Sequence, residues 1–355
     1  MVPRTRQRAV PRATMGHTIP IRLCDGQNRE SNVRWLLTRL LAGLAAVLVV
    51  AVGAGVVLAA QFSGEKAEWA ASTGADAAWL DGSWVDGSKD ESDFAAALPR
   101  LRAFTEVYVH VGEIAEDGTV DPAGYAAADA FLGWMGRELP DVAVVGWLSS
   151  TAESSSLLED RVPKEARARL VEAASAVVDA GFDGVHYAIT PVTVNDPGFV
   201  DLLERTRDAI GAEAVLSVLA LPLEPLPGVR LPVFAVQGGE RYWSTNFLLR
   251  VAELSDVVVV SGSGTGMPSG SLYGGFMARQ TTLALRTVPE TIGLRIGVPP
   301  AADDPAAAAT AVEAVRIALT AHGQRDSFGI AVHAPEELAD DAWTELEEDW
   351  LHIQR

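Results

Sequence analysis

The chain has 355 residues, of which 48% are hydrophobic and 21% are charged, so it is long enough to bury a full-sized core. Its net charge is −19, and a surface this acidic repels phosphate backbones, which excludes nucleic acid as a partner. Cys24 is the only cysteine, so no intramolecular disulfide forms and the core has to supply the stability.

A long apolar run comes first in chain order. Residues 40–60 read LLAGLAAVLVVAVGAGVVLAA and carry no charge. At ~1.5 Å per residue this run matches a hydrocarbon core of ~30 Å, so we expect a transmembrane helix over residues 35–60. Arg34 and Arg39 precede the run and Glu65 is the first charge after it. The positive-inside rule therefore predicts a single-pass cell-membrane protein with a cytoplasmic N-terminus and an extracytoplasmic C-terminal domain.

The segments beside this run show no periodicity. Residues 1–34 hold scattered prolines and arginines, which predicts a disordered cytoplasmic tail, and Met15 is an alternative start. Residues 61–76 predict a linker that spans at most ~50 Å and keeps the next domain near the membrane. A cleaved signal peptide stays open as the alternative to an anchor, because VLA at residues 57–59 offers small residues at a cleavage position.

From residue 77 onward, short apolar runs alternate with amphipathic stretches. Three aspartates are each followed by proline, a pair that is typical of the start of a helix: Asp121, Asp196 and Asp304. Gly181 and Gly211 fit helix ends. Eight strand–helix pairs predict an α/β (β/α)8 TIM barrel over residues 77–355, with a doubly wound open sheet as the alternative. The predicted strands are 77–84, 107–114, 142–150, 184–190, 214–222, 257–264, 291–299 and 328–335.

The fourth predicted strand decides what this barrel does chemically. Side chains alternate along a strand, so Tyr187 and Ile189 share one face while His186, Ala188 and Thr190 share the other. The outer face of a barrel strand packs on helices and is apolar, so we expect the second set to point into the barrel. Thr190 then lies nearest the C-terminal mouth, where barrel enzymes place their chemistry.

The stretch FDGVHYAITP, residues 182–191, resembles the signature strand of family 18 glycoside hydrolases, the chitinase-like barrels, and in particular their bacterial membrane-anchored relatives. The similarity extends over most of residues 77–350. It includes AAWLDGSW, VYVHVGEI, SGSGTGMPSGSLYG and FGIAVHAPEE. The resemblance implies the barrel fold, activity on glycans and a row of acids along this strand.

This sequence departs from that pattern at the functional positions. The resemblance implies acids where Asp183, His186, Ala188 and Thr190 stand, and only Asp183 is retained. It implies the general acid at Thr190 and, at Ala188, the carboxylate that steadies the substrate acetamido group. A tyrosine and an aspartate are implied on the sixth strand, where the chain has Ser263 and Gly264.

These losses predict a barrel without the family's catalysis. Glycoside hydrolysis needs a protonated carboxylic acid, and general acid catalysis contributes typically ~10²–10⁴ in rate. A threonine hydroxyl is too weak an acid to replace it. We therefore expect a catalytically inactive module that binds carbohydrate or an envelope protein. The alternative is an active hydrolase with relocated acids, Glu113 paired with Asp81 or Asp86.

Aromatic and histidine side chains are the candidates for ligand binding. Trp84 and Trp147 end their predicted strands, where their rings can stack on sugars. His110, His186 and His333 lie on even-numbered strands, and Tyr108 belongs to the second. Three inward imidazoles are one arrangement that binds zinc, but we favour ordinary hydrogen-bonded histidines and expect no metal or cofactor.

Overall fold

The computed structural model describes residues 26–151, 164–190, 192–224, 242–263, 267 and 270–352. The chain divides into two compact units, residues 1–54 and 55–355. The described residues of the first unit belong to helix α1 (Gly26–Gln61), within which Arg34–Gln61 is long and apolar enough to cross a membrane. The predicted span, 35–60, lies inside this helix. Because α1 begins at Gly26, the last part of the predicted tail is helical.

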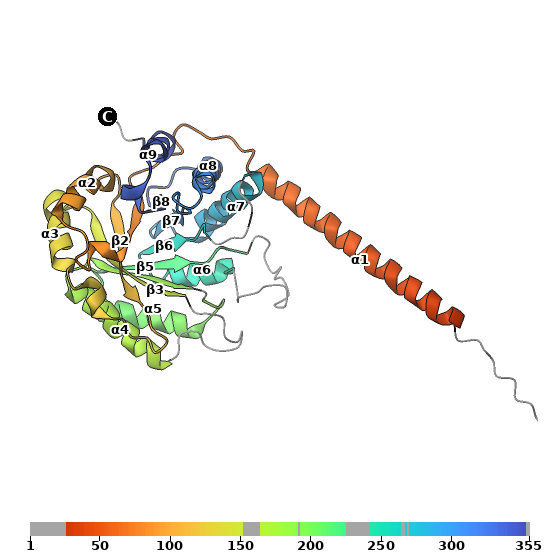
Figure 1. The fold of residues 1–355 in the computed structure, drawn as a ribbon, viewed down its shortest axis with the longest axis horizontal. Coiled ribbons are helices and arrows are strands. Elements are labelled where there is room, and N and C mark those ends of the chain that lie inside the picture. Colours follow the sequence, from red (N-terminus) through yellow and green to blue (C-terminus); the bar gives the residue numbers. More distant parts are fainter. Residues whose placement is uncertain are drawn as a thin grey trace, which may run out of the picture. The chain divides into compact units, whose positions relative to one another are not determined.

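The second unit is a closed barrel of eight parallel strands (Figure 1). Each strand pairs with the next in the sequence, and β1 pairs with β8 to close the ring. This closure confirms the (β/α)8 barrel and rules out the open sheet. The strands are β1 (Ala77–Leu80), β2 (Glu106–Glu113), β3 (Ala143–Thr151), β4 (Gly184–Thr190), β5 (Val215–Ala220), β6 (Val257–Val260), β7 (Gly293–Gly297) and β8 (Phe328–His333).

Helices surround the strands (Figure 1). Asp196 and Asp304 cap their helices as predicted, since each carboxylate accepts backbone N–H groups of the first turn, whereas Asp121 caps only the 3₁₀ turn Pro122–Tyr125. The helices are α2 (Glu91–Leu101), α3 (Ala128–Glu138), α4 (Lys164–Asp179), α5 (Pro197–Ile210), α6 (Thr245–Ala252), α7 (Ser271–Thr287), α8 (Pro305–His322), α9 (Asp340–Leu346) and a π-helical turn (Glu347–Leu351).

Several strands end earlier than the apolar pattern predicts. β1 stops at Leu80 instead of residue 84, because the Asp81 carboxylate accepts the Ser83 N–H (3.0 Å) and turns the chain into a 3₁₀ turn, Gly82–Trp84. β6 stops at Val260 instead of residue 264. The mouth of the barrel is therefore built from loops that begin sooner than expected.

The barrel interior is filled with side chains. Near its base, Arg295 Nη2 lies 3.1 Å from Glu106 Oε1, and both side chains are almost fully buried. Apolar and aromatic residues also fill the interior. They are Ala77, Trp79, Tyr108, Val145, Val257, Val259 and Ala331.

The predicted linker, residues 61–76, is packed on the barrel. Lys66 Nζ lies 2.7 Å from Glu313 Oε1 on α8, and the Ala67 N–H donates to Thr320 Oγ1 (2.9 Å). Ala70 is fully buried. The sequence of this short stretch did not predict these contacts, because the residues that it contacts lie far along the chain.

Candidate active site at the barrel mouth

Strand β4 has the orientation that the sequence predicts. The Tyr187 hydroxyl lies 3.0 Å from Thr206 Oγ1 on α5 and donates to the Leu170 carbonyl on α4 (3.3 Å), so this side chain points outward. On the opposite face, the His186 ring stacks on Tyr108 with 4.3 Å between ring centroids. His186, Ala188 and Thr190 therefore face the interior.

The positions where the family resemblance implies acids hold no carboxylate on this inner face. Ala188 is 6% exposed and Thr190 is half-buried at the mouth end. Asp183 lies at the other end of the strand, where its Oδ2 accepts the Val144 N–H (2.7 Å) and joins β3 to β4. Ser263 follows β6, and its N–H donates to Ser261 Oγ (3.3 Å). Gly264 lies outside the described residues.

Four rings plug the barrel beneath the mouth. Trp79 stacks on His333 at 4.2 Å and Tyr108 stacks on His186 at 4.3 Å, with 6.0 Å between Trp79 and Tyr108. His186 Nδ1 lies 2.8 Å from Ser217 Oγ. Tyr108 and His186 are 0% exposed, so both are core residues in this structure and close the floor of the mouth. Their contact with a ligand stays a prediction.

Burial keeps the histidines of this plug neutral. It lowers the pKa of His186 to about 3, with a smaller contribution from the nearby His333. Burial also lowers the pKa of His333 to about 4, and the Asp303 carboxylate offsets only part of this effect. The pKa of Tyr108 is raised, first by burial and then by the Glu106 carboxylate. The floor of the mouth is therefore uncharged around neutral pH.

A polar cluster lies above the plug, at the ends of β1, β2 and β3. His110 Nε2 lies 2.9 Å from Ser149 Oγ, and the His110 ring meets Trp147 edge-on at 5.0 Å. Burial lowers the pKa of His110, while the charges of Glu113 and Asp81 act in the opposite direction. Glu113 is paired in register with Ser149 of β3, and Asp81 directly follows β1. We call His110, Trp147, Ser149, Asp81 and Glu113 the mouth cluster.

Two predicted site residues lie away from this cluster. The Asp86 carboxylate is exposed and accepts the Ser88 N–H (2.7 Å), and its hydrogen bonds to Ser88 lower its pKa. Trp84 is only 2% exposed, and its Nε1 donates to Glu336 Oε1 (3.0 Å). Lys89 Nζ covers its ring at 4.2 Å. The short β1 turns the Trp84 ring back into the core, so the stacking of this ring on a sugar stays a prediction that the burial does not favour.

Ser149 is the mouth residue that the sequence analysis missed. It stands two positions after Trp147, so the alternation that brings Trp147 inward also brings Ser149 inward. The buried Trp147 Nε1 and His186 Nε2 have no hydrogen-bond partner among the described residues. Two buried polar atoms near the mouth are therefore left without a hydrogen bond among the described residues.

The histidines do not converge on a shared metal position. His110 bonds to Ser149, His186 to Ser217, and His333 stacks on Trp79. Within the part of the chain that the structure describes, no group of three His, Cys, Asp or Glu side chains is placed to hold a metal ion.

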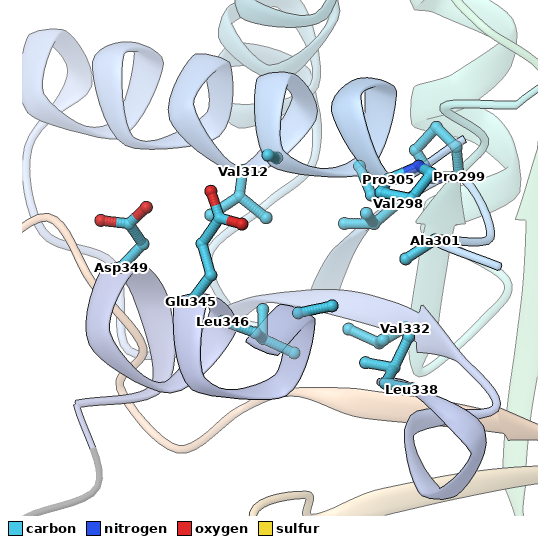
Figure 2. A pocket seen from close by; sticks show the side chains of 13 residues that line it. Val298, Pro299, Ala301, Pro305, Val312, Val332, Leu338, Glu345, Leu346 and Asp349 are labelled. Carbon is cyan, nitrogen blue, oxygen red and sulfur yellow. The ribbon is translucent and has the colours of Figure 1, made fainter. Parts of the chain in front are cut away.

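A hollow lies outside the barrel, between α8, α9 and the loop after β7. Figure 2 shows the carboxylates of Glu345 and Asp349 at one end and the apolar side chains of Val332 and Leu338 at the other. Asp349 Oδ1 lies 3.6 Å from Arg316 Nη1. This hollow is separate from the mouth cluster, because it belongs to the helix layer.

Comparison with solved structures identifies the fold. A putative chitinase A from Streptomyces coelicolor matches with a TM-score of 0.54 and 14% identity over 79% of this chain and 99% of that one. A family GH18 chitinase from Chromobacterium violaceum matches with a TM-score of 0.51 and 13% identity over 78% of this chain and 81% of that one. The fold is that of the family 18 chitinases.

The likeness reaches beyond chitinases. The spore cortex-lytic enzyme SleL of Bacillus cereus matches this chitinase-like barrel with a TM-score of 0.53 and 12% identity, covering 78% of this chain and 74% of that chain. No family model and no curated protein matches the sequence. At these identities the comparison establishes only the shared fold. The residues at the barrel mouth have to be interpreted from this structure alone.

Proposed function

We propose that this protein is a membrane-anchored, extracytoplasmic glycan-binding module built on a chitinase-like barrel that has lost hydrolytic activity. The observation that carries the proposal is the orientation of β4, which brings Ala188 and Thr190 to the mouth where the family resemblance implies acids. A methyl and an aliphatic hydroxyl cannot donate a proton to a glycosidic oxygen at neutral pH.

The mouth cluster supports carbohydrate as the ligand. Trp147 offers a half-buried aromatic ring, while Ser149 and His110 offer hydroxyl and imidazole groups. Asp81 and Glu113 add carboxylates that accept hydrogen bonds from sugar hydroxyls. Because the aromatic plug closes the barrel beneath, the ligand lies across the mouth instead of entering the barrel.

Packing at the end of α1 supports a retained anchor over a cleaved signal peptide. Leu58 and Phe62 are partly buried against the core of the barrel. They lie on either side of Ala59, the last residue of the possible cleavage motif, so cleavage there would remove part of this packing. We therefore expect the mature protein to retain α1. Mass spectrometry of the chain extracted from membranes tests this.

Titration with oligosaccharides tests the binding function. The full chain in detergent is titrated with chitin oligosaccharides and with peptidoglycan fragments, followed by Trp fluorescence. We expect binding that Trp147→Ala weakens, whereas Trp134→Ala, a substitution on α3 remote from the mouth, leaves the affinity unchanged. Absence of binding to every glycan would refute this function and favour an envelope protein as the ligand.

A working hydrolase with relocated acids is the second candidate. The observation in its favour is that Asp81 and Glu113 stand at the ends of the neighbouring strands β1 and β2 and that both charges act on His110, whereas Asp86 lies in the loop after β1. It predicts turnover of a chromogenic chitobioside that Glu113→Gln abolishes and Asp86→Asn does not. Our primary proposal predicts no turnover in the wild-type protein.

A further inference from the structure

The hollow between α8, α9 and the loop after β7 is apolar except at one end. Glu345 and Asp349 are the charged residues of its lining, and all the others are aliphatic or proline. Figure 2 shows the two carboxylates at one end and Pro299 and Pro305 at the other. The space open to the centre of a water molecule is about 60 Å³, whereas a single water needs only ~10–15 Å³. An aliphatic side chain of a ligand therefore has room to enter.

Two helical segments border the hollow, each with one face. On α8 the lining residues have the spacing i, i+3, i+4 and i+7, which puts them on one side of the helix. They are Pro305, Ala308, Ala309 and Val312. The same spacing recurs at positions 342, 345, 346 and 349 of α9 and the π-helical turn. Because the α8 face is built largely from alanine, the two segments leave a groove of the kind that receives the apolar side of a third helix.

The charged end of the groove is negative. Residues 336–349 carry eight acids, and no lysine or arginine occurs between Arg325 and Arg355. Arg316 of α8 lies 3.6 Å from Asp349 (Nη1 to Oδ1), but its Nε also donates to the Ala70 carbonyl (3.0 Å), which holds it beside that one carboxylate. Glu345 is exposed and has no ion-pair partner in the part of the chain that the structure describes. A cation on a ligand would therefore be attracted to this end.

We propose that the groove is a docking site for a basic amphipathic helix of a partner protein. Leucine-type side chains at i, i+3 and i+7 of that helix fill the apolar part, and a lysine or arginine at one end meets Glu345 and Asp349. The aliphatic lining offers nothing to a free metal ion or a sugar, so it is the apolar side chains of the partner that account for it. Docking here is independent of glycan binding, because the groove is separate from the mouth cluster.

Peptide titration tests the chemistry of the partner. The probe is a fluorescent helical peptide of about 15 residues, with leucines at i, i+3 and i+7 and lysines at one end. It is titrated with the full chain in detergent and followed by anisotropy, with empty micelles as the blank. We expect saturable binding, and at least about tenfold weaker binding when glutamate replaces the lysines or serine replaces the leucines. Absence of binding, or equal binding of either control peptide, would overturn the proposal.

A substitution that fills the groove tests its location. Ala309→Phe puts a ring into the hollow and is expected to weaken binding of the lysine peptide by at least about tenfold. Ala306→Phe is the matched control, since Ala306 is exposed on the same helix and does not line the hollow. Unchanged affinity in folded Ala309→Phe would overturn the location. A dimer in analytical ultracentrifugation that Ala309→Phe dissociates would show a second copy in the groove and overturn the partner helix.

A charge swap tests the negative end and does not depend on whether Ala309→Phe folds. Glu345 is exposed, so Glu345→Lys should leave the fold intact. We expect this variant to bind the lysine peptide about tenfold more weakly and to bind the glutamate peptide more tightly than the wild type does. Glu165→Lys, an exposed site on α4, makes the same change in net charge and should alter neither affinity. Wild-type affinities of Glu345→Lys for both peptides would overturn the charge match.

Discussion

Replacing Asp76 by alanine is expected to destabilise the base of the barrel, where its carboxylate joins three segments of the chain. Asp76 lies just before β1 and is 0% exposed. Its Oδ1 accepts the Ile330 N–H of β8 (2.7 Å) and the Trp350 Nε1–H of the C-terminal turn (2.8 Å). Its Oδ2 accepts the Ser72 hydroxyl. One carboxylate thus joins the segment after α1, the closing strand and the end of the chain.

The expected loss follows from the donors that alanine leaves unpaired. The Ile330 N–H and the Trp350 Nε1–H are both buried, and each unpaired buried donor costs about 1–3 kcal/mol. The Ser72 hydroxyl is nearer the surface and finds water. The free energy of unfolding of Asp76→Ala should therefore fall by about 2–6 kcal/mol, a large part of the stability of a typical domain.

Asparagine at the same position is the matched control. Its amide oxygen accepts both buried N–H groups, and its NH₂ donates to Ser72 Oγ, so Asp76→Asn should stay within about 1 kcal/mol of the wild type at neutral pH. Burial raises the pKa of Asp76 above 3.8, so the folded state holds the proton more tightly. The wild type is therefore favoured relative to Asp76→Asn at the lowest pH and loses this advantage as the pH rises through the raised pKa.

Urea unfolding of the full chain in detergent, followed by Trp fluorescence, measures these differences. The reasoning is refuted if Asp76→Ala unfolds within about 1 kcal/mol of the wild type, or if Asp76→Asn is as unstable as Asp76→Ala.

Three further predictions concern the barrel interior. Trp84→Ala should destabilise the protein by about 3–5 kcal/mol in urea unfolding, whereas Trp147→Ala should mainly reduce glycan affinity, by about tenfold or 1.4 kcal/mol. Arg295→Ala leaves the buried Glu106 unpaired and should cost about 3–5 kcal/mol in the same assay. Because burial lowers the pKa values of His186 and His333 to about 3 and 4, their stability contribution is present above about pH 6.5 and is lost as the pH falls. Near pH 5 they should add a slope of about 2.7 kcal/mol per pH unit, which His333→Gln halves. A flat profile there would contradict this.

Much of the barrel was predictable because its signals are local. Short apolar runs predicted the eight strands, and strand β4 has the predicted bounds, 184–190. The Asp-Pro pairs at Asp196 and Asp304 start helices through contacts within one turn. Strand ends were less predictable. The loop after β1 begins at Asp81, because a side-chain hydrogen bond to Ser83 outweighs the apolar pattern.

The site was predictable only in part, because its contacts join distant residues. Alternation correctly predicted that Ala188 and Thr190 face inward. It gave no sign that Trp84 packs under Glu336, more than 250 positions later, or that Tyr108 and His186 stack on each other and close the floor. The hydrogen bond between His110 and Ser149 was equally hidden, since the two residues lie on separate strands.

Side chains on both faces of β4 hold the strand in its register. Tyr187 is held by α4 and α5 outside the barrel, and His186 by Ser217 inside it. Neither anchor depends on the residues at 188 and 190. Substitutions at positions 188 and 190 therefore change the chemistry of the mouth without disturbing the register of the strand.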